Sequence, residues 1–270
     1  MYAGTTIGNR SGNIIGAHQR IDRIARRHLN ILLKDQESFF PEIKQILYFE
    51  GNNGPDGVKR KSPSIDEPWH FIDPTKDHDV SVITMIRDHI ENLAAALRDG
   101  NGERAAFEAA WSAHAIVDGL TPAHHFPLAD KIEELFGVPH HERTGFKEKN
   151  IIKGLSRRDT LAKNWEYWGS RGIFSSHFMF EWGVASTMVG RVYRSSITPQ
   201  DLVDIKLRGY EELFRESLFR VVEMDVYELF RRVGWNWRVA RIVHKKLLPE
   251  INRAVTLAWY AAVIKSREHA

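Results

Sequence analysis

The chain has 270 residues, of which 43% are hydrophobic and 27% are charged, with a formal net charge of +3 and a sequence pI of about 9.0. This composition supports a continuous buried core, in one large domain or two small ones, and excludes a fibrous chain or one that is mostly disordered. The chain contains no cysteine. Disulfides, thiolate metal sites and cysteine nucleophiles are therefore excluded, and histidine and carboxylate side chains are the strong metal ligands that it offers.

The first residues show no basic region followed by a long apolar run, and no stretch approaches ~18 consecutive apolar residues. We therefore expect neither a secretory signal in the given sequence nor a transmembrane segment. A cytoplasmic location is the default expectation.

Hydrophobic residues recur at the helical period along most of the chain. The clearest stripe belongs to a helix that begins near Ser81 and ends at Gly100, and consists of Ile83, Ile86, Ile90, Leu93 and Leu97. Similar patterns predict helices over residues 21–33, 103–117, 176–192, 202–230 and 239–264. Thr198 followed by Pro199 is typical of a helix cap. Since no segment alternates with a two-residue period, we predict an all-α helix bundle.

Two loops are predicted to interrupt the bundle. One covers residues 51–74, which are rich in Gly, Asn, Pro and Ser. The other covers residues 137–158 and is basic, with Lys147, Lys149, Lys153, Arg157 and Arg158. No linker composition separates the residues after about 200, so we expect one helical domain over residues 1–270, with 200–270 as a candidate added helical hairpin.

The segment WSAHAIVDGLTPAHHF carries the sharpest chemical signal. His114 and Asp118 are four residues apart on a predicted helix, which places both on one face. Thr121 and Pro122 then break the helix, so the chain can turn His124 back toward the same point. Imidazole nitrogen and carboxylate oxygen are ligands that suit zinc.

Further candidate ligands lie before and after this segment. His177 and Glu181 repeat the four-residue spacing, Asp56 and His70 lie in the first predicted loop, and His18 lies near the start of the first helix. A single histidine–carboxylate pair on a surface helix is most often solvated. Here Ala113, Ala115 and Ile116 lie around His114, and Phe178, Met179 and Phe180 follow His177. Ionisable side chains in such apolar surroundings are costly unless they are paired or bound to a metal.

The order of these residues resembles the zinc-dependent phospholipase C family and the related single-strand-specific zinc nucleases. The resemblance covers about residues 14–190 and is most specific in H-x-x-x-D-x-x-x-x-P-x-H from His114 to His124, followed by H-x-x-x-E from His177 to Glu181. The WHFID run at residues 69–73 is nuclease-like, whereas glutamate at position 181 is phospholipase-like. The resemblance implies an all-α metallohydrolase with two or three zinc ions, and it would suggest export.

The resemblance also implies how the ligands are shared. Asp56, His70, His114 and Asp118 would hold one zinc ion, and His124, His177 and Glu181 would hold a second. Asp118 would bridge toward a third ion bound by His18. In the family, the amino group and carbonyl of an N-terminal tryptophan complete this third site, whereas this chain begins with Met1 and has its first tryptophan at position 69.

The spacing between His124 and His177, 53 residues, is longer than the resemblance leads us to expect. His140 and His141 are therefore rival ligands for the second zinc ion. We favour His177, because neither rival is followed by a carboxylate four residues later.

Such a cluster would hydrolyse a phosphodiester with metal-activated water. Asp56 is the candidate catalytic residue that orients or deprotonates this water, and a purely structural ligand role is the alternative. The substrate could be a phospholipid or a single-stranded nucleic acid. Candidate base-stacking residues for the latter are Trp69, Phe71, Phe126, Trp165, Tyr167 and Trp168, each of which could instead pack in the core.

Peripheral membrane contact is a further expectation. The stretch from Trp235 to Lys246 combines tryptophan with arginine and lysine and could lie on an anionic membrane surface. An amphipathic helix packed on the bundle is the reading that we favour for it. Two alternatives concern the whole protein: a non-catalytic helical scaffold stabilised by metal, and a phosphohydrolase with a His-Asp doublet, represented here by His78-Asp79.

Overall fold

The computed structural model describes residues 1–2, 16–34, 39–61, 71–76, 80–125, 128–139, 142–143, 148 and 150–268, and is all-helical over them, without a strand. The N-terminal half contains α2 (Ala17–Leu32), α3 (Ile43–Tyr48), the 3-10 helix η1 (Gly51–Asn53), α4 (Pro55–Lys61), α5 (Ser81–Arg98), α6 (Gly102–Gly119) and the 3-10 helix η2 (Pro122–His124). It is followed by α7 (Leu128–Phe136), α9 (Arg157–Trp168), α10 (Ile173–Thr187), α11 (Pro199–Arg208), α12 (Tyr210–Glu223), α13 (Val226–Val233), α14 (Trp237–Ile242), the π-helix η4 (Val243–Leu247) and α15 (Leu248–Arg267). The predicted all-α class is confirmed.

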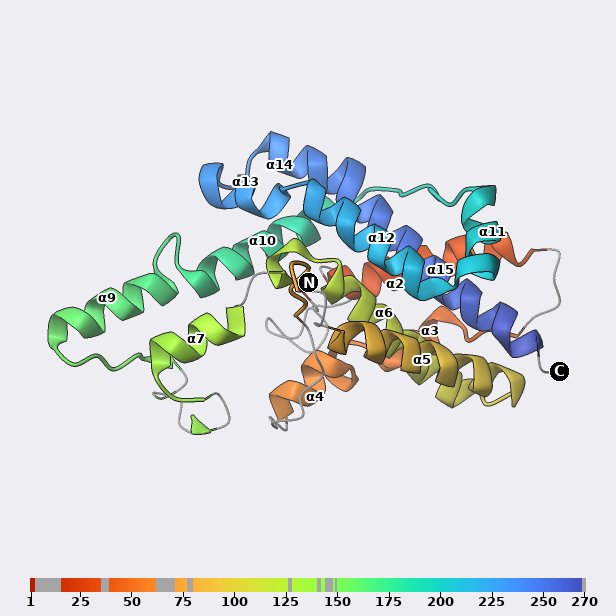
Figure 1. Ribbon diagram of the computed structural model, residues 1–270, viewed down its shortest axis with the longest axis horizontal. Coiled ribbons are helices and arrows are strands. Elements are labelled where there is room, and N and C mark those ends of the chain that lie inside the picture. The colour runs from red at the N-terminus through yellow and green to blue at the C-terminus, as the bar shows by residue number, and fades with distance from the viewer. Residues whose placement is uncertain are drawn as a thin grey trace.

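The centre of the molecule is built from α2, α5, α6 and α15, which pack on one another (Figure 1). The stripe predicted for α5 is buried over its whole length, from Ile83 to Leu97. The helix α15 brings the C-terminal segment into the same core, because Trp259 is fully buried and its indole Nε1 donates to the Ala109 carbonyl of α6 at 3.0 Å. Burial of these apolar faces is the main force that holds the helices together.

The helix α6 positions the residues of greatest chemical interest. Asn101 caps its start by accepting from the Arg104 amide, and alanines at 105, 106, 109, 110 and 113 let neighbouring helices approach closely. The helix ends at Gly119, before Thr121 and Pro122, as the predicted helix break requires. Thr121 and Pro122 also start the short helix η2, which the sequence did not predict. The chain therefore turns directly after α6, so that η2 lies beside the last turns of that helix.

The C-terminal helices differ in part from the sequence prediction. Thr198 caps α11 and Pro199 is its first helical residue, which confirms the predicted cap. The single helix expected over 202–230 is wrong: the chain breaks at Gly209, with φ 80°, and at Asp225, with φ 47°. Both values lie in the left-handed region, which interrupts an α-helix.

Around η4, Val243 and Leu247 are buried while Lys245 and Lys246 are exposed, as expected for a helix packed on the bundle.

The first predicted loop is also partly wrong, since residues 51–74 include η1 and α4. Pro55 occupies the first position of α4 and Asp56 lies in its first turn, both favourable at a helix start. The helix has seven residues and is too short to display a hydrophobic period.

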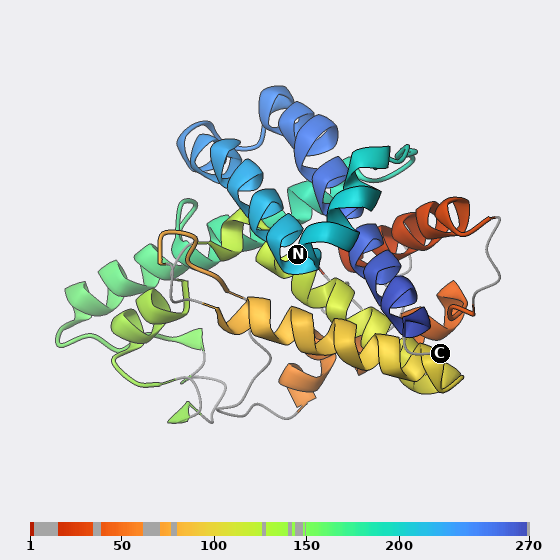
Figure 2. The ribbon, with the colours of Figure 1, turned by 45° about the vertical axis from the view of Figure 1, so that its right-hand side comes forward.

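Two helices that the sequence did not predict, α7 and α9, project together from the bundle (Figures 1 and 2). We call residues 128–171 the arm. It has a small apolar core of its own around Leu135, Ile152 and Tyr167, and Phe174 of α10 packs against it. Across the described helices, none is both long enough and apolar enough to span a bilayer.

Candidate metal centre

Asp118 lies at the middle of a buried group of histidines. His114, one turn earlier on α6, places its Nε2 3.3 Å from Asp118 Oδ2. The turn through η2 returns His124, so its Nδ1 lies 3.7 Å from Asp118 Oδ1. The hydroxyl of Thr121 donates to the Val117 carbonyl at 2.6 Å and fixes this turn. The helix and the break after it thus bring three candidate ligands together.

The start of the chain and α2 complete the surroundings of Asp118. Nε2 of His18 lies 3.3 Å from Asp118 Oδ1 and 2.9 Å from the Met1 carbonyl oxygen. The Met1 amino group donates to Asp118 Oδ1 at 2.6 Å and lies 3.4 Å from Glu181 Oε1. Amino group and carbonyl of the first residue therefore flank Asp118, the two groups that the resemblance assigns to an N-terminal tryptophan. The His18 and His114 rings stack at 4.1 Å.

Asp56 lies at the edge of this group. Its Oδ1 is 3.8 Å from His114 Nε2, and its side chain is 31% exposed, compared with 3% for Asp118. A carboxylate in this position reaches both the buried cluster and solvent.

A second group adjoins the first. Nε2 of His124 and Nε2 of His177 lie 2.9 Å and 3.0 Å from Glu181 Oε1, and the two rings stack at 5.0 Å. His177 and Glu181 are one turn apart on α10. Phe71 covers the rings, 5.1 Å from His124 and 6.4 Å from His177 between centroids.

The donor spacing fits bound metal. With bonds of 2.0–2.2 Å, the ligand atoms of a tetrahedral zinc ion are ~3.3–3.6 Å apart. Nitrogen and oxygen atoms at 2.9 to 3.4 Å in these groups are close to that spacing. Two clusters could bind a metal ion: the buried group of His18, Glu50 and His114, and the partly buried group of His124, His177 and Glu181.

The two central carboxylates are held in their charged form. Burial alone would raise the pKa of Asp118 and of Glu181, but the Met1 amino group and the surrounding imidazoles hold both pKa values well below their usual range. The pKa of the Met1 amino group is raised to about 10, because Asp118 and Glu181 outweigh its burial. A cation could bind the charged carboxylates directly, whereas the Met1 amino group would first have to release a proton.

The histidines differ in protonation. Burial disfavours charge on His114, but Glu50 and Asp118 raise its pKa well above the usual range. Burial, together with the Met1 amino group, lowers the pKa of His124 to about 4 although Asp118 opposes this. At neutral pH His124 is therefore ready to bind a metal ion, whereas His114 must first release a proton.

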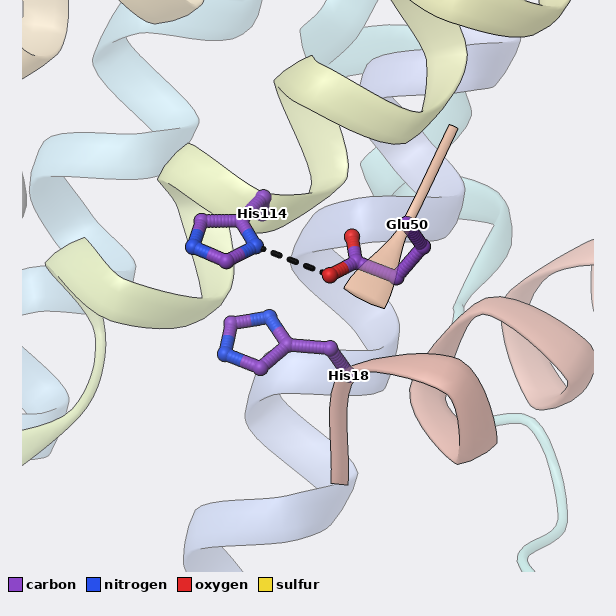
Figure 3. A group of neighbouring side chains, drawn as sticks. All are labelled: His18, Glu50 and His114. Atoms are coloured by element: carbon purple, nitrogen blue, oxygen red, sulfur yellow. Dashed lines mark hydrogen bonds and ion pairs between the residues drawn. The ribbon is translucent and has the colours of Figure 1, made fainter. Parts of the chain in front are cut away.

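Glu50 is a site residue that the sequence did not indicate. Its Oε1 accepts from His114 Nδ1 at 3.1 Å and from the Gly51 amide at 3.0 Å, and its side chain is buried. Figure 3 shows both imidazoles, His18 and His114, with one nitrogen toward Glu50 and the other away from it. Glu50 immediately precedes η1 and has no helical spacing to another ligand, so no pattern marks it.

Asp22 is a second residue that was missed. It is buried one turn after His18 on α2, and its oxygens have no hydrogen-bond partner within the described part of the chain. Burial, and then the Glu50 charge, raise the pKa of Asp22 well above its usual value. The four-residue spacing from His18 was the signal that could have found it.

The structure brings together seven of the eight predicted ligands: His18, Asp56, His114, Asp118, His124, His177 and Glu181. His70 lies outside the described residues, as do His140, His141 and the His78-Asp79 doublet. His177, the ligand favoured over those rivals, contacts Glu181 as the spacing suggested.

Comparisons with models of protein families, with curated proteins and with solved structures find no match to this chain. Fold and site together define an all-helical protein with buried histidine–carboxylate clusters that could bind a metal ion.

Proposed function

We propose that this protein is a zinc-dependent phosphodiester hydrolase of the phospholipase C type. One observation carries the proposal: Asp118 and Glu181, two buried carboxylates from different helices, lie 2.6 Å and 3.4 Å from the same amino group, and imidazoles surround each. Adjoining clusters of this composition suit two or more metal ions, and the resemblance to the zinc phospholipases and nucleases names zinc.

In this proposal, His114, Asp118 and Asp56 hold one ion with His70, and His124, His177 and Glu181 hold another. His18 and the backbone of Met1 face Asp118 and provide the donors of a third position. Zinc, when bound, would neutralise phosphate charge and lower the pKa of water toward ~7. The donor set contains no thiolate and consists of carboxylates and imidazoles.

Asp56 is the residue to which we assign the orientation or deprotonation of the attacking water. Its carboxylate is the most exposed of the described predicted ligands and lies beside His114. A carboxylate at the solvent edge can accept a proton from a water that attacks phosphorus and orient that water. Asp118 and Glu181 are less exposed, at 3% and 12%, and are assigned to binding the metal ions.

Metal content and turnover of a soluble diester test this proposal. Purified protein should contain at least two zinc ions and hydrolyse bis(p-nitrophenyl) phosphate, and His114→Ala and Asp118→Ala should lose both properties. His244→Ala is the matched control, since this histidine contacts the Tyr193 hydroxyl far along the chain from the cluster and should keep both. Protein that binds zinc but hydrolyses no diester would contradict the proposed enzymatic activity. It would favour the alternative of a non-catalytic scaffold stabilised by metal.

A further inference from the structure

The arm exposes large apolar side chains to solvent. The exposed fractions are 47% for Ile151, 102% for Leu155, 72% for Leu161, 70% for Trp165 and 42% for Trp168. Single exposed apolar residues are common on protein surfaces, but a group on one projecting element marks an interaction site.

Three of these residues form a stripe on α9. Leu161, Trp165 and Trp168 are spaced by four and three residues, which places them on one side of the helix. Tyr167, on another side, is buried and contacts Phe136 and Phe174 at 5.4 and 5.5 Å between ring centroids. Leu161 and Trp165 take no part in the arm core and face solvent, whereas Trp168 is partly exposed and also contacts Tyr167 at 4.8 Å between ring centroids.

Basic residues outnumber acidic ones in the segment that carries the stripe. Residues 151–171 contain five basic residues, Lys153, Arg157, Arg158, Lys163 and Arg171, and two acidic ones, Asp159 and Glu166, so their net charge is +3. The Asp159 carboxylate accepts from the Leu155 amide. Arg157 and Arg158, both exposed, begin the helix that carries the stripe.

We propose that the arm docks on an anionic lipid surface. Tryptophan suits the boundary between headgroups and acyl chains, leucine enters the apolar layer, and arginine and lysine pair with anionic headgroups. Exposed leucines favour lipid over nucleic acid, because a leucine side chain offers no face on which a base can stack. The arm lies within the 53-residue spacing between His124 and His177 that set this chain apart from the family pattern.

Aromatic contacts connect the arm to the metal centre. Trp168 contacts Phe174 at 5.0 Å, Phe174 is 6.5 Å from Phe178, and Phe178 is 6.2 Å from Tyr2. Phe178 directly follows His177 on α10, and Tyr2 directly follows Met1. A surface bound by the arm is therefore held near the clusters. The consequence that the diester is a phospholipid rests on the proposed function, whereas the docking itself does not.

Sedimentation with vesicles tests the docking. The unaltered protein should bind vesicles of phosphatidylcholine mixed with phosphatidylserine, more weakly as salt is added, and should bind pure phosphatidylcholine less. The double variant Leu161→Ser, Trp165→Ser should lose about tenfold or more in affinity, and Arg157→Glu, Arg158→Glu should lose the preference for anionic lipid.

The matched control is Leu207→Ser, Phe219→Ser, which removes a leucine 78% exposed on α11 and a phenylalanine 60% exposed on α12. It should bind vesicles like the unaltered protein. No binding to anionic vesicles, an equal loss in the control, or single-stranded DNA binding that the arm variants abolish would each overturn the proposal. Turnover of bis(p-nitrophenyl) phosphate is measured separately, so a lack of activity would contradict the proposed function and not the docking.

Discussion

The Glu50 carboxylate lies 3.1 Å from Nδ1 of His114, while Nε2 of the same ring lies 3.3 Å from Asp118. The pKa of Glu50 is lowered, because His114 outweighs the effect of burial, so the carboxylate is charged and accepts the bond. When His114 gives up one proton, Glu50 keeps the other on Nδ1. The lone pair of Nε2 is then directed at the cluster, the arrangement by which a carboxylate orients a metal-binding imidazole.

Replacement of this carboxylate should weaken metal binding. For Glu50→Gln we expect zinc affinity to fall by ~10–100-fold, because the neutral amide no longer raises the basicity of the ring as the carboxylate does. Competition with a chromophoric chelator measures the change. Glu108→Gln is the control, since it removes a similar contact to His89 Nδ1, 2.5 Å long, outside the site. Unchanged affinity in Glu50→Gln would show that the contact only supports the fold.

A substitution at Asp56 should lower catalysis while zinc remains bound to the protein. In Asp56→Asn the side chain keeps its size but loses its charge and its basicity, so kcat for bis(p-nitrophenyl) phosphate should fall by ~10²–10⁴-fold. Zinc held by His124, His177 and Glu181 should remain, as measured by metal analysis. Asp88→Asn, a change at an exposed aspartate of α5, should leave both unaltered. Full turnover in Asp56→Asn would assign Asp56 a structural role alone.

Local spacing explains which parts of the site were predictable. His114 with Asp118, and His177 with Glu181, lie one helical turn apart, so a helical period places each pair on one face before any tertiary structure is known. Glu50 meets His114 across 64 residues, and only the packing of α3 and η1 against the bundle brings them together. Such long-range contacts leave no periodic trace in the sequence.

The same limit applies to the fold. The helix α5 was predictable because its apolar residues face one core. The helix α9 has Tyr167 buried on one side and Leu161 and Trp165 exposed on another, so its apolar residues do not form a single stripe. A helix with two apolar sides lacks the pattern by which amphipathic helices are recognised.

His124 should make the metal-free protein sensitive to acid. Its pKa is about 4 in the fold and 6.5 ordinarily, so as pH falls below 6.5 the unfolded chain takes up a proton that the folded one refuses. The resulting loss of stability grows until about pH 4 and reaches about 3 kcal/mol. In His124→Asn, the difference in unfolding free energy between about pH 7 and pH 5 should shrink by about 2 kcal/mol, as measured by urea denaturation with EDTA present. Leu93→Ala removes a buried side chain of α5 that has no titrating group, and should lower stability equally at both pH values. The same pH difference in His124→Asn as in the unaltered protein would mean that this imidazole is free to charge in the folded state.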